Sequence, residues 1–272
     1  MAKRSAITTK EYLTSAPLPQ FNESYTVIEH GFVIDKTLET LLSKGFTVKN
    51  ELYRCNMNAQ IAQGVYHLNY GNDPEMGMMF AWSNSYDKSM RFKCAIGAYV
   101  FVCSNGIVSG DMGSWGRKHT GSAAEETQEA ILLQIDNADV YYNQLVLDKE
   151  NMKQIILKPK NSAEIMGRLF LEHKLINVEQ LSIVKNELHT PSYKYEGDSD
   201  SLWCLYNHIT HALKTSHPKS WLDQQRMIHW FLTNEYQISN SIVGLTESIT
   251  PVPVVTNQLT IEDAIKEAEQ GG

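Results

Sequence analysis

The sequence predicts an α+β fold in which a mainly antiparallel sheet is covered by a long helix and followed by a helical C-terminal region. Four β-type runs lie between about residues 46 and 111, and short polar turns join them. Such turns cannot hold the crossover that a parallel pair requires, so neighbouring strands are expected to be antiparallel. After a Gly-rich loop the period changes, because apolar residues from Ile131 to Leu145 recur at helical spacing. A helix over about residues 123–147 is therefore expected to pack across the sheet.

A short helix that begins near Asp35 is expected before the sheet. Asp35 suits the N-cap position, and Gly45 suits the position after the last turn. The β-type runs that follow read FTVKNELYRC, AQGVYHLNYG, MGMMFAWSNS and RFKCAIGAYVFVCSNGIVSG. Within the last run, Asn105-Gly106 is the strongest hairpin signal in the chain and predicts a tight turn with positive φ. Replacing Gly106 by Val is expected to cost roughly 1 kcal/mol or more through backbone strain.

Helix-start signals recur in the second half of the chain. Ser122 and Glu125 fit a capping box. Asn177 suits an N-cap, and Pro218 suits the first turn of a helix. The predicted organisation is an N-terminal arm (1–24), an α+β core domain (25–150), a helical region packed on the core (151–240), and a linker with an acidic tail (241–272).

The composition describes a globular protein and limits its partners. The 272 residues carry a formal net charge of −7, which argues against a histone-like protein that coats duplex DNA by bulk charge. The four cysteines lie far apart without a CxxC pair, which is typical of reduced thiols. No window reaches the roughly 18 apolar residues that a membrane span requires. We therefore expect a cytoplasmic protein, in the host cell if a phage encodes it.

A basic segment between residues 84 and 122 contrasts with the acidic chain. It carries five cations against two carboxylates, a local net charge of +3, from Lys88, Arg91, Lys93, Arg117, Lys118, Asp87 and Asp111. On a strand, Arg91 and Lys93 point to the same face. Such a face is suited to follow a phosphate backbone while Trp82, Tyr86 or Trp115 stack on bases. The alternative is an ordinary solvated sheet face.

The start of the long helix offers a second anion site. Thr120, Gly121 and Ser122 follow Arg117-Lys118-His119, so free backbone N–H groups lie next to cations. Glu125 and Glu126 in the same first turn already compensate the helix dipole, so simple helix capping is the favoured explanation of these residues.

Enzymatic and metal chemistry have weaker signals. Cys103 or Ser104 with His119 resembles a nucleophile and base, but no acidic residue is placed to orient the base, and a buried strand cysteine explains Cys103. His208 and His211 lie three apart without a third ligand at a recognisable spacing. The chain has no phosphate-binding loop, dinucleotide fingerprint or HExxH motif. The sequence predicts no catalytic residue, no cofactor and no metal site.

The runs NSYDKS (84–89), FVCSNGIVSG (101–110) and HTGS (119–122), followed by a long helix, resemble the phage- and plasmid-related proteins grouped as domain of unknown function 932. YTVIEHGFVIDKTLETLLSKGF and DSDSLWCLYNHI fit the same pattern, so the resemblance covers about residues 25–235. Tyr86 and Lys88 depart from the histidine and glycine that such proteins often have, which argues against histidine chemistry in this loop. The motif positions are Asn84, Ser85, Asp87, Cys103, Asn105, Gly106, Thr120 and Gly121.

The resemblance implies a product of a mobile element. The order of elements is also similar to the core of phage single-strand annealing proteins, an analogy at the level of fold. We expect a non-enzymatic protein that binds single-stranded nucleic acid, assists recombination or replication, and forms oligomers. One alternative is an anti-defence or regulatory protein that binds a host protein through its acidic surface; another is an enzyme acting on nucleic acid. The expected binding residues are Lys88, Arg91, Lys93, Trp115, Arg117, Lys118 and His119.

Overall fold

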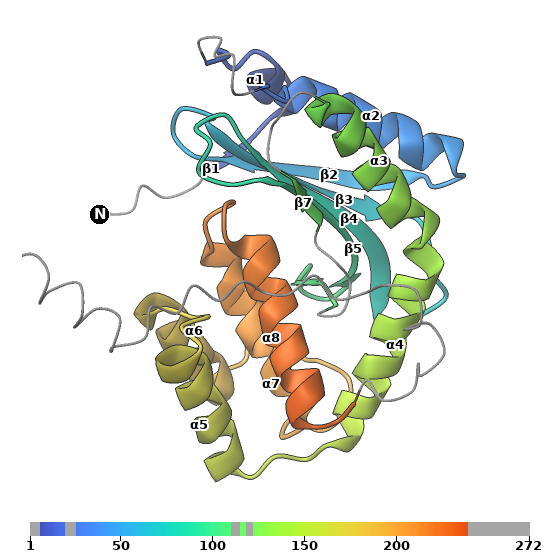
Figure 1. Cartoon of the computed structure of the whole chain (residues 1–272). Coiled ribbons are helices and arrows are strands. Elements are labelled where there is room, and N and C mark those ends of the chain that lie inside the picture. The colour runs from blue at the N-terminus through green and yellow to red at the C-terminus, as the bar shows by residue number, and fades with distance from the viewer. Residues whose placement is uncertain (1–5, 20–25, 110–114, 118–121, 239–272) are drawn as a thin grey trace, which may run out of the picture. The chain divides into compact units, whose positions relative to one another are not determined.

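An antiparallel sheet with helices on both faces dominates the computed structural model (Figure 1). The structure describes residues 6–19, 26–109, 115–117 and 122–238. The strands are β1 (Ala6–Thr8), β2 (Val48–Cys55), β3 (Ile61–Leu68), β4 (Met76–Ser85), β5 (Phe92–Val100), β6 (Gly106–Ile107) and β7 (Trp115–Arg117). They follow the order β1-β2-β3-β4-β5-β6, and β7 also pairs with β5. Every pairing between these strands is antiparallel, as the short polar turns predict.

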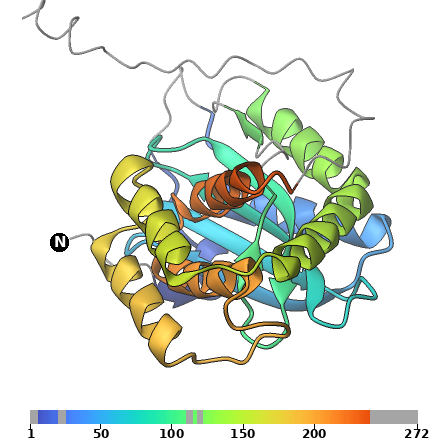
Figure 2. The same cartoon turned by 90° about the horizontal axis from the view of Figure 1, so that it is seen from below.

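The helices surround this sheet, which confirms the predicted α+β class with a helical C-terminal region. In chain order they are α1 (Lys10–Thr14), α2 (His30–Ser43), α3 (Ala123–Asp136), α4 (Ala138–Gln154), α5 (Pro159–Gly167), the π-helix η1 (Arg168–Glu172), α6 (Val178–His189), α7 (Leu202–Ala212), the 3₁₀-helix η2 (Leu213–Thr215) and α8 (Trp221–Glu235). α2 and α3 lie on one face of the sheet, and α7 and α8 lie on the other (Figures 1 and 2). None of the helices in the described ranges has the length and apolar character that a bilayer crossing demands.

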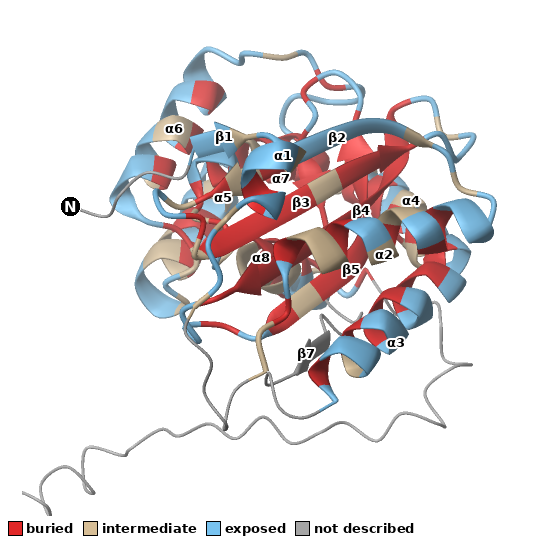
Figure 3. Ribbon diagram, turned by 90° about the horizontal axis from the view of Figure 1, so that it is seen from above, coloured by how far each residue is buried: buried red, intermediate tan, exposed pale blue. Residues whose placement is uncertain are grey.

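The two helical layers explain the composition of the central strands. β4 is buried over its whole length, and Figure 3 shows β3 and β4 almost entirely in the colour of buried residues. Alternate side chains of β4 meet different layers, as a period of two requires. Trp82 stacks on His30 of α2, whereas Ser83 donates a hydrogen bond to the carbonyl of Pro218 before α8. The central strands β3 and β4 are therefore buried on both faces, and apolar residues do not simply alternate with polar ones along them.

Two predicted helices have different bounds in the structure. The expected helix over 123–147 is two helices, α3 and α4, separated at Asn137. The Asn137 amide donates to the Leu133 carbonyl at 2.8 Å, and the residue adopts φ −100° and ψ 13°. Asparagine favours such local bonds over continuation of a helix. The helix expected from Asp35 begins at His30, and Gly45 follows its end with φ +84°, as its position indicates.

Of the other three helix-start signals, one is confirmed and two are wrong. Asn177 and Gln180 form a complete capping box at α6. Ser122 makes no capping bond to backbone; its hydroxyl donates to Glu126 at 2.5 Å, so the predicted box with Glu125 is wrong. Pro218 lies before α8 instead of in its first turn, because that helix begins at Trp221.

Part of the predicted N-terminal arm belongs to the core. β1 pairs with β2, and Thr9 caps α1 by accepting a hydrogen bond from the backbone of Tyr12. Leu13 is fully buried beside α2. Residues 6–14 are thus held by pairing and packing, although their polar composition indicates a detached arm.

The turn predicted at Asn105-Gly106 is wrong by one residue. Ser104 is the residue with positive φ, at +56°, and Gly106 lies in β6. A Cβ added to Gly106 would lie 2.6 Å from the ring of Trp221. The glycine is therefore needed for the close approach of α8 and not for a left-handed turn.

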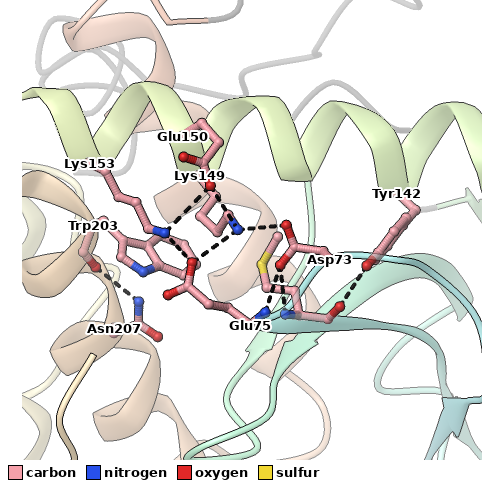
Figure 4. Close-up of polar contacts among 9 residues, drawn as sticks. Asp73, Glu75, Tyr142, Lys149, Glu150, Lys153, Trp203 and Asn207 are labelled. Atoms are coloured by element: carbon pink, nitrogen blue, oxygen red, sulfur yellow. Dashed lines mark hydrogen bonds and ion pairs between the residues drawn. The ribbon is translucent and has the colours of Figure 1, made fainter. Parts of the chain in front are cut away.

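A buried ionic cluster attaches the start of β4 to α4 (Figure 4). The Lys149 ammonium lies 2.6 Å from a carboxylate oxygen of Asp73, 3.0 Å from Glu75 and 2.9 Å from Glu150. Lys149 is 1% exposed, and Lys153 adds a second ion pair to Glu75. The other oxygen of Asp73 accepts two backbone N–H groups at 2.9 Å. This cluster fixes the β3–β4 connection, and thereby the sheet, against the long α4.

Candidate nucleic-acid interface

The motif NSYDKS forms the closed loop between β4 and β5. The Ser85 hydroxyl donates to the Met90 carbonyl at 2.9 Å and accepts from the Met90 N–H at 3.3 Å. Asp87 accepts from the backbone of Ser89 at 2.9 Å, and Lys88 adopts φ +60°. These bonds hold both ends of the loop together, and the chain leaves it at the exposed Arg91.

The remaining residues of this motif attach the loop to α2. Asn84 donates to the Ile28 carbonyl at 2.7 Å. The Tyr86 hydroxyl accepts from the backbone N–H of His30 at 2.8 Å, and the two rings stack at 3.9 Å. Tyr86 is 3% exposed and Trp82 is fully buried. The expectation that these two rings stack on bases is therefore wrong, because both are packing residues of the α2 layer.

The second motif, around SNG, attaches the β5–β6 turn to α7. Asn105 is fully buried and donates to the Asn207 carbonyl at 2.9 Å. Lys214 donates to the Cys103 carbonyl. Burial raises the pKa of the Cys103 thiol, so the thiolate that a nucleophile requires is disfavoured. Cys103 and Asn105 have structural roles here.

Arg91 and Lys93 line a surface cleft of about 470 Å³ next to the N-terminus of α8. Ser89 and Met90 complete one side of this cleft. The opposite side belongs to the connection before α8 and to its first turn: His217, Lys219, Ser220 and Asp223. We call this site the basic cleft.

Two hydrogen bonds fix the connection that supplies the opposite side. Ser83 on β4 donates to the Pro218 carbonyl at 3.0 Å, and Arg54 on β2 donates to the Ser216 carbonyl. Both donors belong to strands of the central sheet. Lys219 is therefore held beside a strand more than one hundred residues earlier in the chain.

The charges of the basic cleft favour an anion. Among the residues that line the cleft, the cations Arg91, Lys93 and Lys219 outnumber the carboxylate Asp223, so the lining carries a net charge of +2. Lys93 is half-buried and ion-paired with Asp223, whose side chain is 42% exposed. Because the Asp223 carboxylate remains partly open to solvent, a phosphate can compete with it for this lysine. The N-terminus of α8 adds the positive end of a helix dipole.

His217 is a neutral hydrogen-bond donor in the basic cleft. Burial lowers its pKa, and the nearby cations Arg54 and Lys219 lower it further against the opposing effect of Asp87. The ring is therefore mostly uncharged at pH 7. Its Nδ1 accepts from the backbone N–H of Lys219 at 3.2 Å, which leaves the proton on Nε2.

The backbone of β7 brings a second predicted segment to the same strand. Arg117 lies opposite Phe92, and Trp115 lies opposite Cys94, in the antiparallel pairing with β5. Two predicted binding segments, distant in sequence, are thus adjacent at the start of β5. Lys118, His119, Thr120 and Gly121 lie outside the described residues.

Sequence reasoning missed Lys219 and His217. The only local signal is the run HPKS, which lies before a helix that the sequence places one turn too early. Their proximity to Arg91 depends on long-range packing of α8 on the sheet, which no local pattern reveals.

Other titratable groups are structural. His229 bonds to Asp148 at 2.9 Å and to the Tyr206 hydroxyl at 3.1 Å, and all three side chains are buried between helices. His208 and His211 lie 3.7 and 3.9 Å from Glu187. Across the described ranges no three His, Cys, Asp or Glu side chains gather in a way that could hold a metal ion.

These features define an α+β protein with a surface cleft beside the start of β5 and the N-terminus of α8, lined by three basic side chains. Residues 19–235 match the family model described as Domain of unknown function (DUF932). The match spans more than half of the sequence, so the chain belongs to this family, as the motifs around Asn84 and Asn105 indicate. No curated protein and no solved structure matches the chain.

Proposed function

We propose that this chain is a non-enzymatic single-stranded nucleic-acid-binding protein of a phage or other mobile element, which assists recombination or replication in the cytoplasm. One observation carries the proposal: cations from two distant segments, Arg91 and Lys93 on one side and Lys219 on the other, converge on one cleft. The free state of all four cysteines fits a reducing compartment.

In this proposal the basic cleft binds the phosphate backbone and leaves the bases outside. Arg91 offers a planar fork that matches phosphate oxygens, and Lys93 and Lys219 act as point charges. The neutral His217 donates one further hydrogen bond. Because such contacts position a strand without reading its sequence, the contribution of the basic cleft to affinity is expected to be similar for different sequences. The acidic net charge disfavours duplex coating, so a single strand in a local cleft fits the chain better.

Replacing Asp223 by Asn is expected to strengthen binding. Asparagine keeps the shape of the side chain but removes the carboxylate that competes with phosphate for Lys93. At a partly exposed position the removed repulsion corresponds to about 1 kcal/mol, or roughly fivefold in affinity. Fluorescence anisotropy with a labelled oligonucleotide, run in parallel on single-stranded DNA, duplex DNA and RNA, measures this change.

Glu39→Gln is the matched control for Asp223→Asn. Glu39 is an exposed carboxylate of α2, on the other face of the sheet, and the change alters net charge equally. Its affinity is expected to equal that of the wild type. An equal gain in both variants would show that only net charge matters and would contradict the assignment of the basic cleft.

A further inference from the structure

A second cleft, of about 280 Å³, lies on the α8 face of the sheet. Its walls are mostly apolar and include Val65, Met79 and the ring of Trp221. Arg54, Gln63 and Lys214 supply polar groups. The volume is at the small end of ligand sites in proteins, which suits a single ring better than a fused pair. We call this site the sheet cleft.

Gln63 presents an unpartnered donor in the sheet cleft. It is 1% exposed and lies opposite Arg54 in the β2–β3 pairing. Its Oε1 accepts from Arg54 at 3.4 Å, which orients the amide. Its Nε2 has no hydrogen-bond partner among the described residues. A buried donor without an acceptor is costly, so the side chain is poised to bind a carbonyl oxygen of a ligand.

Lys214 and His67 indicate which charges a ligand of the sheet cleft carries. Lys214, in η2, is exposed and supplies positive charge at the rim. His67 lies on the same face of β3 as Gln63, and its ring stacks on Tyr99 at 3.9 Å. Burial, helped by Lys49, lowers the pKa of His67 to about 4, so this ring is neutral at pH 7. The arrangement suits an uncharged planar ring with a carbonyl, joined to an anionic group.

We propose that the sheet cleft binds one oxo-pyrimidine nucleotide, with a ring carbonyl accepting from Gln63 Nε2, the ring against Trp221 and Met79, and the phosphate near Lys214. The inference rests on the proposed function, which it deepens by giving the protein a pocket for a base. The same chemistry arises from a free nucleotide and from one residue of a bound strand.

Isothermal titration calorimetry with thymidine monophosphate tests this pocket directly. The wild type is expected to bind the nucleotide and not 2-deoxyribose 5-phosphate, which lacks the base. Gln63→Glu keeps an acceptor for Arg54 but removes the donor, so affinity is expected to fall at least tenfold. Lys214→Ala is expected to lose several-fold, and Lys36→Ala, a lysine on the other face, is expected to bind like the wild type. Melting temperatures show whether each variant folds.

The outcomes separate this inference from the proposed function. No nucleotide binding by the wild type, or equal binding by a folded Gln63→Glu variant, overturns the inference even if oligonucleotides bind through the basic cleft. Gln63-dependent binding of the mononucleotide, with no binding of any oligonucleotide, supports the pocket for a free nucleotide and overturns the proposed function. Pyrimidine-rich oligonucleotides that lose their preference in Gln63→Glu support the pocket as a site within a strand.

Discussion

Replacing Lys149 by Met is expected to reduce the free energy of unfolding by about 3–5 kcal/mol, because it leaves the buried Asp73 carboxylate without its cation and Glu75 with Lys153 alone. The side chains of Asp73 and Glu75 are less than 10% exposed, and both contact the Lys149 ammonium. Methionine fills much of the space but offers no charge. Urea unfolding followed by circular dichroism at pH 7 measures the loss.

The pKa of Lys149 explains why pH 7 is a suitable pH for this measurement. Burial opposes its charge, but hydrogen bonds with Asp73, Glu150 and Glu75 outweigh burial and raise the pKa above its ordinary value. A raised lysine pKa contributes stability that is complete below the unfolded value of about 10.4 and is lost as the pH rises through the folded value. At pH 7 the contribution is therefore present in full.

Lys44→Met is the matched control for Lys149→Met. Lys44 pairs with Asp136 at 2.6 Å, but both side chains are more than 40% exposed. Its loss is expected to cost less than about 1 kcal/mol. A loss of similar size in both variants would contradict the structural role of the ionic cluster.

Replacing Gly106 by Val is expected to destabilise the fold by about 1–3 kcal/mol, through overpacking against Trp221. The added Cβ would lie 2.6 Å from the indole ring and 3.1 Å from the methyl group of Met79. Because Gly106 does not have positive φ, backbone strain contributes little. Thermal and urea unfolding of the variant measure the effect.

A double-mutant cycle with Trp221→Ala distinguishes the two causes. If the clash with the ring is responsible, Gly106→Val costs much less when the ring is absent, and the coupling exceeds about 0.5 kcal/mol. Additive effects would instead indicate strain in the backbone of β6 and would restore the turn that the sequence predicts.

Gly106 illustrates which parts of the fold the sequence can predict. The strands follow from β-type runs and polar turns, which are local features. The left-handed residue at Ser104 and the helix break at Asn137 depend on how the turn and helix pack, so local patterns misplace them by a residue or miss them. Leu13 is similar, because its burial depends on contact with α2.

The candidate site was predictable only in part. Arg91 and Lys93 are visible as a basic pair on one strand, and the structure places both in the basic cleft. Lys219 and Asp223 lie before and within the first turn of α8, and their place beside Lys93 in the basic cleft is a property of tertiary packing. The motif residues Asn84 and Asn105 bond to buried carbonyls, so their family pattern reflects loop architecture more than binding.

The salt dependence of single-stranded DNA affinity tests the central claim most directly. If Arg91 and Lys93 neutralise phosphates, the double change Arg91→Ala with Lys93→Ala weakens binding and lowers the salt slope by about 0.7 for each lost contact. The melting temperature is expected to change only modestly, because Arg91 is exposed and Lys93 loses a single ion pair, with the partly exposed Asp223. The paired control is Lys36→Ala with Lys44→Ala, which removes two cations outside the basic cleft and is expected to keep the wild-type slope. Equal slopes for the wild type and the Arg91/Lys93 variant, or no wild-type binding at low salt, would contradict the account and favour a host-protein partner.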